Sequence, residues 1–371
     1  MEERPAQGHG QGEERGPPGR IAPTDRTRYH GDQAARIDLS RPVNALRGTE
    51  APSSEPAVPR LLTEAQPHDP RPSRLPPLLA LLRPRQWYKN LLVLVPILFS
   101  GHLATTSLWP AVGATFLAFC ALSGAVYASN DIVDAERDRA HPRKRHRPIA
   151  SGAVSPVLAI VLSVLLAAAG LAVLAWVNAL TFAMGVAYLL LQCAYNGGVK
   201  RLLLWDAIAV AFGFVLRALA GTTALEIGPP TEWLIVCTFL FALYLALAKR
   251  RAELLHLEGD GEAEAHRPVL AAYNPAFVEQ TMQTSATLLL MAYTLYTFFG
   301  PDKWLMFTLP FAFYGVFRHS WLVQQGQVAD EAEAMWRDRA LQVNTVLWVA
   351  TLLVVQAGWP QAFFAWLGAL P

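Results

Sequence analysis

The chain has 371 residues, of which 53% are hydrophobic and 16% are charged, and its formal net charge is +2. Its mean hydropathy is +0.26. This balance is typical of a membrane protein and excludes an ordinary soluble domain, and no nucleic-acid partner is expected.

Residues 1–75 differ in composition from the rest of the chain. They are rich in Pro, Gly, Arg, Glu and Gln and have no apolar periodicity. Such a segment cannot bury enough apolar surface to offset its chain entropy, so we expect a disordered tail. It lacks the apolar run of a secretory signal peptide, and its arginines favour the cytoplasmic side. The predicted domains are therefore this tail and a transmembrane domain over 76–371.

Nine apolar segments follow the tail, and several are shorter than the span of about 20 residues that a bilayer requires. Tilt and flanking residues can close that gap. The sequence therefore predicts an all-α, polytopic bundle of nine transmembrane helices. The segments are approximately 88–104, 107–129, 155–176, 179–195, 203–222, 231–248, 282–299, 302–320 and 341–358.

Positive charge alternates between the loops. The connections at 101–107, 176–178 and 222–232 contain no Lys or Arg, whereas the connections between them are basic. Basic loops stay on the cytoplasmic side, so we predict a cytoplasmic N-terminus and an outside C-terminus. The last stretch, WPQAFFAWLGALP, is aromatic and uncharged, as in an interfacial helix on the outer side.

The loop SNDIVDAERDRAHPRKRHRPIASG (129–152) holds the densest charge outside the predicted tail. On a continuous helix Asp131, Asp134 and Asp138 lie within roughly 60° of one another, beside Asn130. Crowded carboxylates favour a divalent cation, and Mg²⁺ adds substrate phosphate oxygens to a few carboxylates. The following basic residues could bind those phosphates. The alternative is a solvated loop whose charges only set topology.

Two further cytoplasmic loops carry charge. In YNGGVKRLLLWDAIAVAFGFVLRALAG, Asp206 and Arg217 share one face of a helix; they line a polar cavity or form a structural pair through a mediator. In KRRAELLHLEGDGEAEAHRPVLAAYN, basic residues with Arg267 and Tyr273 form either a lid over an anionic substrate or an anchor at the lipid head groups. LRPRQWYKN before the first span and Asp338 with Arg339 before the last are weaker signals.

In this order and spacing, LRPRQWYKN, the NDxxDxxxD and HPxKRxRPIASG block, YNGGVKR and KRRAEL resemble the UbiA superfamily of intramembrane prenyltransferases. The resemblance spans about 79–358 and is greatest to the decaprenyl-phosphate phosphoribosyltransferase branch. The chain has only Asp206 where ordinary UbiA enzymes have a second Asp-rich motif, and Lys200 and Arg201 there suit an additional phosphate. It departs from the expected pattern at Tyr195–Asn196 and Arg318–His319.

The resemblance implies nine helices around a cavity open to the cytoplasm of a bacterial plasma membrane. It implies Mg²⁺-dependent transfer of 5-phosphoribose from 5-phosphoribosyl-1-pyrophosphate to a polyprenyl monophosphate, toward lipid-linked arabinose of cell-envelope glycans. A homo-oligomer is compatible with the sequence. The implied metal and diphosphate ligands are Asn130, Asp131, Asp134 and Asp138. The other implied catalytic residues are Lys89 and Asp206. The implied substrate contacts are Arg83, Gln86, Lys144, Arg147, Tyr195, Lys200, Arg217, Lys249, Arg250 and Glu253.

The sequence is compatible with two other functions. One is an aromatic prenyltransferase of the same fold, which would use a prenyl diphosphate donor. The other is a non-catalytic carrier of lipid phosphate, which would have little need of clustered acids. A CDP-alcohol phosphotransferase is disfavoured because its DGxxAR pattern is missing.

Overall fold

The computed structural model describes residues 76–141, 144–228, 231–260, 272–300, 302–327 and 337–368, with the backbone alone for 256–260. These residues belong to one compact unit, Asp69–Pro371. The predicted tail at 1–75 lies outside the described residues. Every regular element in the described ranges is helical, as predicted.

The elements are α-helices and 3₁₀ helices, the latter labelled η. In chain order they are α1 (Pro77–Leu81), η1 (Pro84–Leu94), α2 (Val95–Phe99), η2 (Thr106–Leu108), α3 (Trp109–Val133), α4 (Ala135–Ala140), η3 (Lys144–His146), α5 (Pro156–Val177), α6 (Ala179–Gly197), η4 (Val199–Arg201), α7 (Trp205–Leu225), α8 (Glu232–Asp260), α10 (Pro275–Phe299), η6 (Lys303–Thr308), α11 (Leu309–Gln324), α13 (Arg339–Gln356) and α14 (Trp359–Gly368).

Six helical stretches of the described chain are long and apolar enough to cross a membrane. They are Thr106–Val133, Pro156–Val177, Ala179–Gly197, Trp205–Leu225, Glu232–Leu255 and Arg339–Gln356. The other three predicted segments also contain helix, namely η1 with α2, α10, and η6 with α11. The first of these is two short helices in series rather than one continuous α-helix. The count of nine spans therefore stays a prediction.

Side-chain caps and prolines fix where several helices begin. Ser155 Oγ accepts a hydrogen bond from the Leu158 amide at the start of α5, where Pro156 occupies the first position. Asn178 ends α5 and begins α6, because its side-chain oxygen accepts from the Thr181 amide at 2.8 Å. Capping oxygens satisfy amides that have no partner within the helix, so these positions set sharp boundaries between apolar runs.

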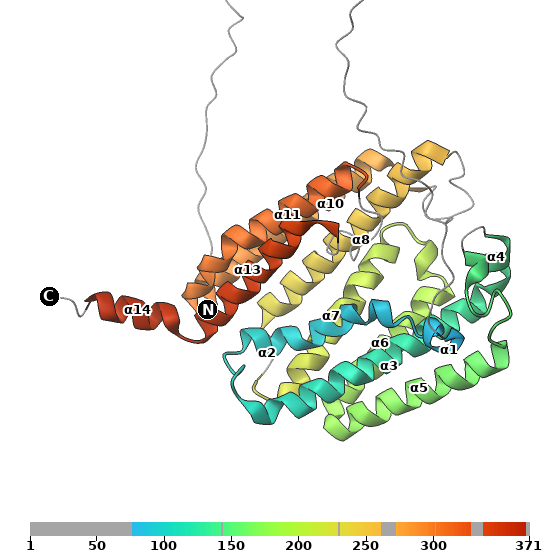
Figure 1. Cartoon of the computed structure of the whole chain (residues 1–371), viewed down its shortest axis with the longest axis horizontal. Helices are drawn as coiled ribbons and strands as arrows, with labels where there is room; N and C mark the ends of the chain where they lie inside the picture. The colour runs from blue at the N-terminus through green and yellow to red at the C-terminus, as the bar shows by residue number, and fades with distance from the viewer. Residues whose placement is uncertain are drawn as a thin grey trace, which may run out of the picture. The chain divides into compact units, whose positions relative to one another are not determined.

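The helices pack as two neighbouring groups joined through α7 (Figure 1). In the first, α3 packs on α5, α6 and α7, with a core that includes Phe119, Leu122 and Tyr188. In the second, α8 packs on α7 and α10, with Tyr244 and Met282 in its core. The helices α11 and α13 pack against each other. This arrangement leaves η1 and α2 running beside α7, next to the site.

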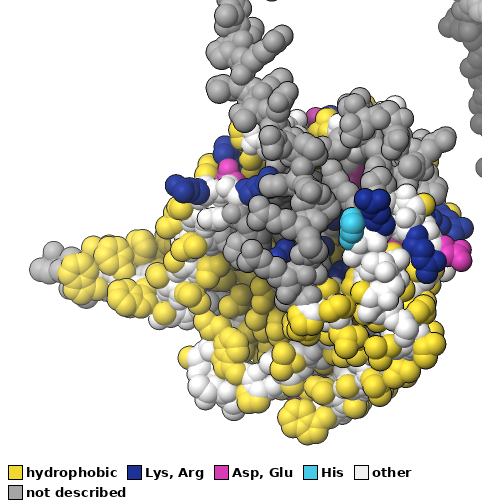
Figure 2. Space-filling view, turned by 45° about the vertical axis from the view of Figure 1, so that its right-hand side comes forward, with side chains coloured by type: hydrophobic (Ala, Val, Ile, Leu, Met, Phe, Trp, Pro, Cys, Tyr) yellow, Lys and Arg dark blue, Asp and Glu magenta, His cyan; other side chains and the backbone are white. Residues whose placement is uncertain are grey.

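The outer faces of the helices are apolar. On α5, Val157, Leu165 and Trp176 are 71%, 61% and 74% exposed. Apolar surface on this scale is stable only against lipid or another apolar surface. Figure 2 shows charged side chains gathered along the upper side of the visible face, with hydrophobic side chains covering the part below. The charged side of the bundle carries the candidate site.

Candidate active site

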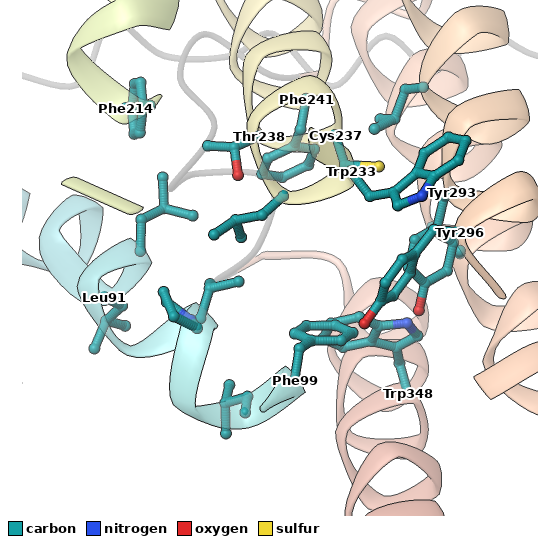
Figure 3. Close-up of a pocket in the computed structure, with 18 of the residues that line it drawn as sticks. Leu91, Phe99, Phe214, Trp233, Cys237, Thr238, Phe241, Tyr293, Tyr296 and Trp348 are labelled. Carbon is teal, nitrogen blue, oxygen red and sulfur yellow. The ribbon is translucent and has the colours of Figure 1, made fainter. Parts of the chain in front are cut away.

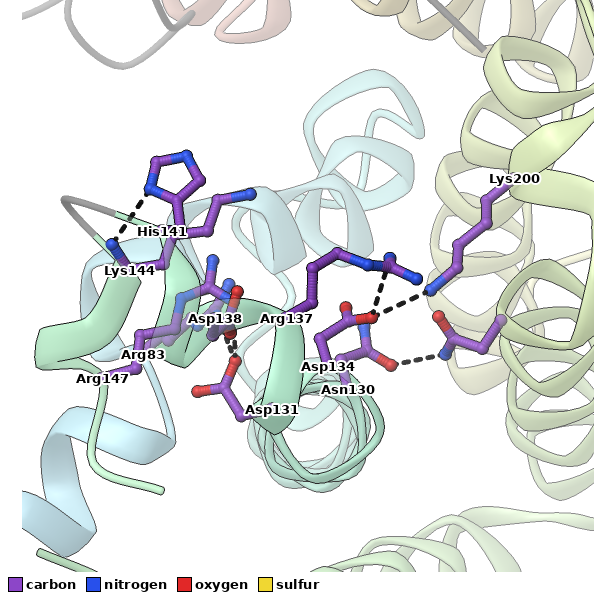
Figure 4. A network of polar contacts seen from close by, with 11 residues as sticks. Arg83, Asn130, Asp131, Asp134, Arg137, Asp138, His141, Lys144, Arg147 and Lys200 are labelled. Atoms are coloured by element: carbon purple, nitrogen blue, oxygen red, sulfur yellow. Dashed lines mark hydrogen bonds and ion pairs between the residues drawn. The ribbon is translucent and has the colours of Figure 1, made fainter. Parts of the chain in front are cut away.

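The site is centred on two buried carboxylates at the end of α3. Asp131 is 2% exposed and Asp138, on α4, is 3% exposed. Arg147 Nη1 donates to both, at 3.2 Å to Asp131 Oδ1 and 2.7 Å to Asp138 Oδ2. Arg83 Nη2 also donates to Asp131 Oδ1. Asp131 on α3 and Asp138 on α4 thus share the Arg147 guanidinium (Figure 4).

Arg83 reaches this centre from a strained backbone. It precedes η1 in the left-handed conformation, with φ 50° and ψ 60°, which is uncommon for a residue other than glycine. Its guanidinium carbon lies 5.2 Å from the centroid of the Tyr127 ring, one turn before Asp131 on α3. Strain of this kind persists only where the surroundings hold the residue in place, and here the ion pair and the aromatic ring do so.

Asp134 points to a different partner from the other two acids. The helix breaks at this residue, because α3 ends at Val133 and α4 begins at Ala135. Asp134 Oδ1 lies 3.7 Å from Lys200 Nζ and 3.6 Å from Arg137 Nη1. The structure therefore differs from the prediction that the three acids share one wall of a continuous helix. Only Asp131 and Asp138 converge, on Arg147.

Asn130 joins the site to the next basic loop. Its side-chain oxygen accepts a hydrogen bond from Asn196 Nδ2 near the end of α6. Lys200 on η4 pairs with Asp134 in the same region, so the YNGGVKR segment meets the NDxxD segment (Figure 4). These contacts bring the two motifs, whose joined asparagines are 66 residues apart in sequence, into one polar cluster.

The balance of charge at this site favours an anion. Four cationic side chains pair with the three carboxylates, which leaves one excess positive charge. The cations are Arg83, Arg137, Arg147 and Lys200. The Lys144 amide donates to His141 Nδ1 at 3.4 Å beside Arg147, which places another basic residue at the same edge (Figure 4). Excess positive charge near partly solvated side chains attracts phosphate groups.

Asp206 belongs to a second, buried network. It is fully buried and accepts hydrogen bonds from Arg250 Nε at 2.7 Å and from the Tyr273 hydroxyl at 2.6 Å. Arg250 Nη1 also donates to Glu253 at 3.0 Å, and Tyr195 lies near enough to interact electrostatically with Arg250. Burial, together with the Asp206 carboxylate, raises the pKa of the Tyr273 phenol.

This second network changes the interpretation of the third loop. Arg250 is only 3% exposed and is engaged by acids of its own chain, so it ties α8 to α7, while Tyr273 ties the segment before α10 to the same Asp206. Of the predicted lid, Tyr273 is a buried anchor, and Arg267 lies outside the described residues. Lys249 and Gln86 are half-buried. They stay candidates for substrate contact.

Arg217 is held inside the bundle by neutral groups. Its Nε donates to Asn90 at 2.8 Å, its Nη1 to the Gly213 carbonyl at 2.7 Å and its Nη2 to the Tyr188 hydroxyl at 3.0 Å. Its guanidinium also lies over the Tyr188 ring at 4.6 Å. The alternative of a mediated pair with Asp206 is absent from the described contacts, since Asp206 bonds to Arg250 instead. Arg217 thus ties η1 to α6 and α7.

A large apolar chamber lies between η1 with α2 on one side and α8, α10, α11 and α13 on the other. Its volume is about 970 Å³. Lys89 and Tyr88 line it from η1, which places Lys89 on the chamber rather than among the paired acids. Phe99, Tyr296 and Trp348 form an aromatic group on one wall (Figure 3). The chamber suits a hydrocarbon chain.

Several residues of the site escaped the sequence interpretation. Tyr127 lies within an apolar run, where an isolated aromatic residue gives no signal of its own. Asn196 and His319 appear in the sequence only as departures from the expected family pattern. Each acquires its role from a partner far away in sequence, Asn130 in the case of Asn196.

Comparison with known proteins agrees with this geometry. Residues 93–345 match the model of the UbiA prenyltransferase family. A decaprenyl-phosphate phosphoribosyltransferase of Mycolicibacterium smegmatis is 33% identical over 308 residues, covering 78% of this chain and 95% of the relative. One from Corynebacterium glutamicum is 34% identical over 287 residues, covering 74% of this chain and 84% of the relative.

Solved structures agree on the fold. A UbiA homolog from Archaeoglobus fulgidus, bound to GPP and Mg²⁺, superposes with a TM-score of 0.60 at 17% identity, covering 76% of this chain and 99% of that chain. A digeranylgeranylglyceryl phosphate synthase superposes with a TM-score of 0.56 over 76% of this chain and 97% of that chain. These matches confirm the resemblance drawn from the motifs, and with the apolar helices they indicate a multi-pass membrane protein. The chain belongs to the UbiA prenyltransferase family.

Proposed function

We propose that this protein transfers 5-phosphoribose from 5-phosphoribosyl-1-pyrophosphate to a polyprenyl monophosphate and releases pyrophosphate. The observation that carries the proposal is the match to decaprenyl-phosphate phosphoribosyltransferases over 95% of the length of one relative. The excess of cations around Asp131, Asp134 and Asp138 supports it, because the donor and the acceptor both bring phosphate groups.

In the proposed reaction the bond between ribose C1 and the pyrophosphate oxygen breaks, and the pyrophosphate leaves with the electron pair. A phosphate oxygen of the lipid forms the new bond to C1. Arg83, Arg147 and Lys200 stabilise the charge that builds on the leaving group, since fixed cations act most strongly where charge develops. The lipid phosphate is already anionic at pH 7 and needs no general base. Holding both substrates in line supplies much of the rate.

The acids fit a magnesium ion by the chemistry of their donor atoms. Among the described residues, no three His, Cys, Asp or Glu side chains form a ready ligand set. Mg²⁺ is commonly held by one or two carboxylates plus substrate phosphate oxygens, and the convergent Asp131 and Asp138 provide such a pair. Asp131 and Asp138 would hold Mg²⁺, which would neutralise charge on the diphosphate, and Asp134 and Asn130 would have to turn from Lys200 and Asn196 to join them.

The test is transfer of labelled ribose from 5-phosphoribosyl-1-pyrophosphate to polyprenyl phosphate by the purified protein, with and without Mg²⁺. Asp131→Ala and Asp138→Ala should each lower the rate at least about 100-fold. Glu136→Ala is the matched control, because Glu136 is an exposed acid on the same short helix as Asp138, and it should keep wild-type activity.

The outcomes separate the proposal from its rivals. Full Mg²⁺-dependent turnover in Asp131→Ala would contradict the assignment of the acids. If the wild-type protein transfers no ribose but moves a prenyl group from a prenyl diphosphate to an aromatic acid, the function is that of an aromatic prenyltransferase. Binding of lipid phosphate without any turnover would identify a carrier.

We also propose that the site faces the cytoplasm and that its product is used to build cell-envelope glycans. The basic loops that carry the site face the cytoplasm, where phosphorylated sugars are found, with the N-terminus inside and the C-terminus outside. The product, a polyprenyl-phosphoryl phosphoribose, would be a precursor of lipid-linked arabinose for the cell envelope. Gln86, Lys89, Lys144, Tyr195 and Lys249 remain candidates for contacts to the two substrates.

A further inference from the structure

His319 on α11 carries a buried nitrogen that lacks a partner in the described part of the chain. The residue is 7% exposed and lines the apolar chamber. Its Nδ1 lies 2.7 Å from the Tyr244 hydroxyl, whereas its Nε2 makes no hydrogen bond to any described residue. Buried polar atoms are nearly always paired, so an unpaired one at the wall of a chamber calls for a partner within that chamber.

His319 lies at one end of the chamber. The residues of α11 that line it are spaced by one, three or four positions and form one stripe, in which His319 comes last: Phe311, Ala312, Gly315, Val316 and His319. Arg318, beside it, pairs with Asp338 near the charged side of the bundle. The aromatic group of Phe99, Tyr296 and Trp348 lies elsewhere along the wall (Figure 3).

The other walls show the same change along the chamber. In η1, Tyr88 and Lys89 line it before the apolar residues that follow, and in α8, Tyr244 is the last polar lining residue before Lys249 and Arg250. The end of the chamber near the cationic segments therefore carries Tyr88, Lys89, Tyr244 and His319, and the walls beyond it are mainly apolar, with Ser100, His102 and Thr231 as further polar lining residues. That pattern matches an amphipathic ligand with its head group at the polar end.

We infer that His319 Nε2 donates a hydrogen bond to a phosphate oxygen of the prenyl-phosphate acceptor, and so fixes its head group at the polar end of the chamber. The inference deepens the proposed function and rests on it. The lipid tail extends from this point along the apolar walls.

The network around Tyr244 prepares the imidazole for that role. The Tyr244 oxygen lies 2.7 Å from His319 Nδ1, 2.9 Å from Ser320 Oγ and 3.2 Å from the Val316 carbonyl. The Val316 carbonyl and Nδ1 compete for the single phenol proton, and the contact to Nδ1 is the shorter, at 2.7 Å against 3.2 Å; with the proton placed there, Nδ1 is the acceptor. The imidazole then carries its own proton on Nε2, the nitrogen without a described partner, and can donate it to the ligand.

Two substitutions of His319 distinguish the roles of its two ring nitrogens. His319→Asn keeps a polar atom near the position of Nδ1 and can still contact Tyr244, but it is too short to reach the position of Nε2. His319→Gln places an amide N–H near the position of Nε2. The dissociation constants to measure are those of polyprenyl phosphate and of the polyprenol of equal length, for the full-length protein in detergent.

His319→Asn should weaken binding of polyprenyl phosphate about tenfold, because a hydrogen bond to a charged group is lost. Its affinity for the polyprenol should stay within about twofold of wild type, since the apolar walls are unchanged. His319→Gln should keep most of the preference for phosphate. In the transfer assay, KM for the lipid should rise in His319→Asn while KM for the ribosyl donor stays unchanged.

Three results would overturn the inference. The first is an unchanged preference of His319→Asn for polyprenyl phosphate over polyprenol. The second is an equal loss of affinity for these two lipids in that variant. The third is an affinity of the wild-type protein for phosphatidic acid that equals its affinity for polyprenyl phosphate. A wild-type protein that transfers no ribose contradicts the proposed function itself. A wild-type protein that does transfer ribose, with variants that keep their preference for phosphate, contradicts only the role of His319.

Discussion

Arg318 and Asp338 form a bidentate ion pair between the end of α11 and the start of α13. Arg318 Nη2 lies 2.7 Å from Asp338 Oδ2, and Nε lies 3.3 Å from Oδ1. Asp338 also caps α13, because its Oδ1 accepts from the Leu341 amide at 2.7 Å. These bonds, the one from Arg318 above all, lower the pKa of the Asp338 carboxyl.

The lowered pKa predicts how stability responds to acid. A carboxyl whose pKa is lower in the folded state than in the unfolded state stabilises the fold above its unfolded pKa of about 3.9. That contribution is lost as the pH falls through the lower, folded-state pKa. Asp338→Asn keeps a capping oxygen but removes the charge. We therefore expect the variant to have a lower melting temperature than wild type at pH 7.

Thermal unfolding of both proteins in detergent between pH 3 and pH 7 checks this prediction. The difference in melting temperature should shrink as the pH falls below about 4. The wild-type carboxyl then becomes protonated and loses the negative charge that the Asn variant already lacks. A difference that stays constant down to pH 3 would show that the charge of Asp338 is not what stabilises the joint between α11 and α13.

At the scale of residues, the sequence predicts partners well only where they are near in the chain. Asp131, Asp138 and Arg147 belong to one motif, and the structure brings them together. Asp206 and Arg217 also share one helix, yet each bonds to residues from other elements, Arg250 and Asn90 respectively. Helical spacing says which side chains share a face, but the packing of distant helices decides what that face meets.

At the scale of elements, the close contact between α7 and η1 depends on a glycine, Gly221. A methyl group on Gly221 would lie 2.1 Å from the carbonyl oxygen of Val93, far inside contact distance. Gly221→Ala should therefore push η1 away from α7 and lower the melting temperature by several degrees, as overpacking costs about 1–3 kcal/mol. Because η1 carries Lys89 and follows Arg83, activity should fall with stability.

Gly113→Ala is the matched control for this prediction. Gly113 lies within α3, and a methyl group there meets no atom within 4 Å. Alanine is a better helix former than glycine, so this variant should be as stable as wild type or more stable. Differential scanning measurements on both variants decide the matter. Equal melting temperatures for Gly221→Ala and wild type would mean that η1 can shift without cost.

The elements themselves follow from the sequence to different degrees. The long apolar runs predict α3, α5, α6, α7, α8 and α13, because length and hydropathy alone identify such helices. The first segment was predicted as one span, but it is η1 followed by α2, with Pro96 near the junction. Apolar content cannot distinguish a 3₁₀ helix from an α-helix, since both bury the same side chains.

At the scale of the whole molecule, two surfaces have to fit one bilayer. The exposed apolar faces of the helices fit lipid, and charged side chains gather along one edge of the face that Figure 2 shows. Basic segments are retained on the cytoplasmic side of a membrane, so this edge and the polar end of the chamber should face inward. The lipid acceptor would then enter from the bilayer and meet its water-soluble donor at the cytoplasmic surface.

This orientation predicts which positions a membrane-impermeant maleimide reaches. Thr105 is exposed in the uncharged connection before α3, and Arg145 is exposed in the basic loop after α4. In a background in which Cys120, Cys193 and Cys237 are replaced, spheroplasts should show labelling of Thr105→Cys and none of Arg145→Cys.

Permeabilising the same cells should expose Arg145→Cys to the reagent, which controls for its reactivity and expression. The expected labelling depends on charge rather than on helix count, because the candidate span Thr106–Val133 separates the two positions. Labelling of Arg145→Cys from outside would show that the bundle has the opposite orientation in the membrane. The charged site would then face a compartment without phosphorylated sugars, and the proposed ribosyl donor would have to be abandoned even if the fold were kept.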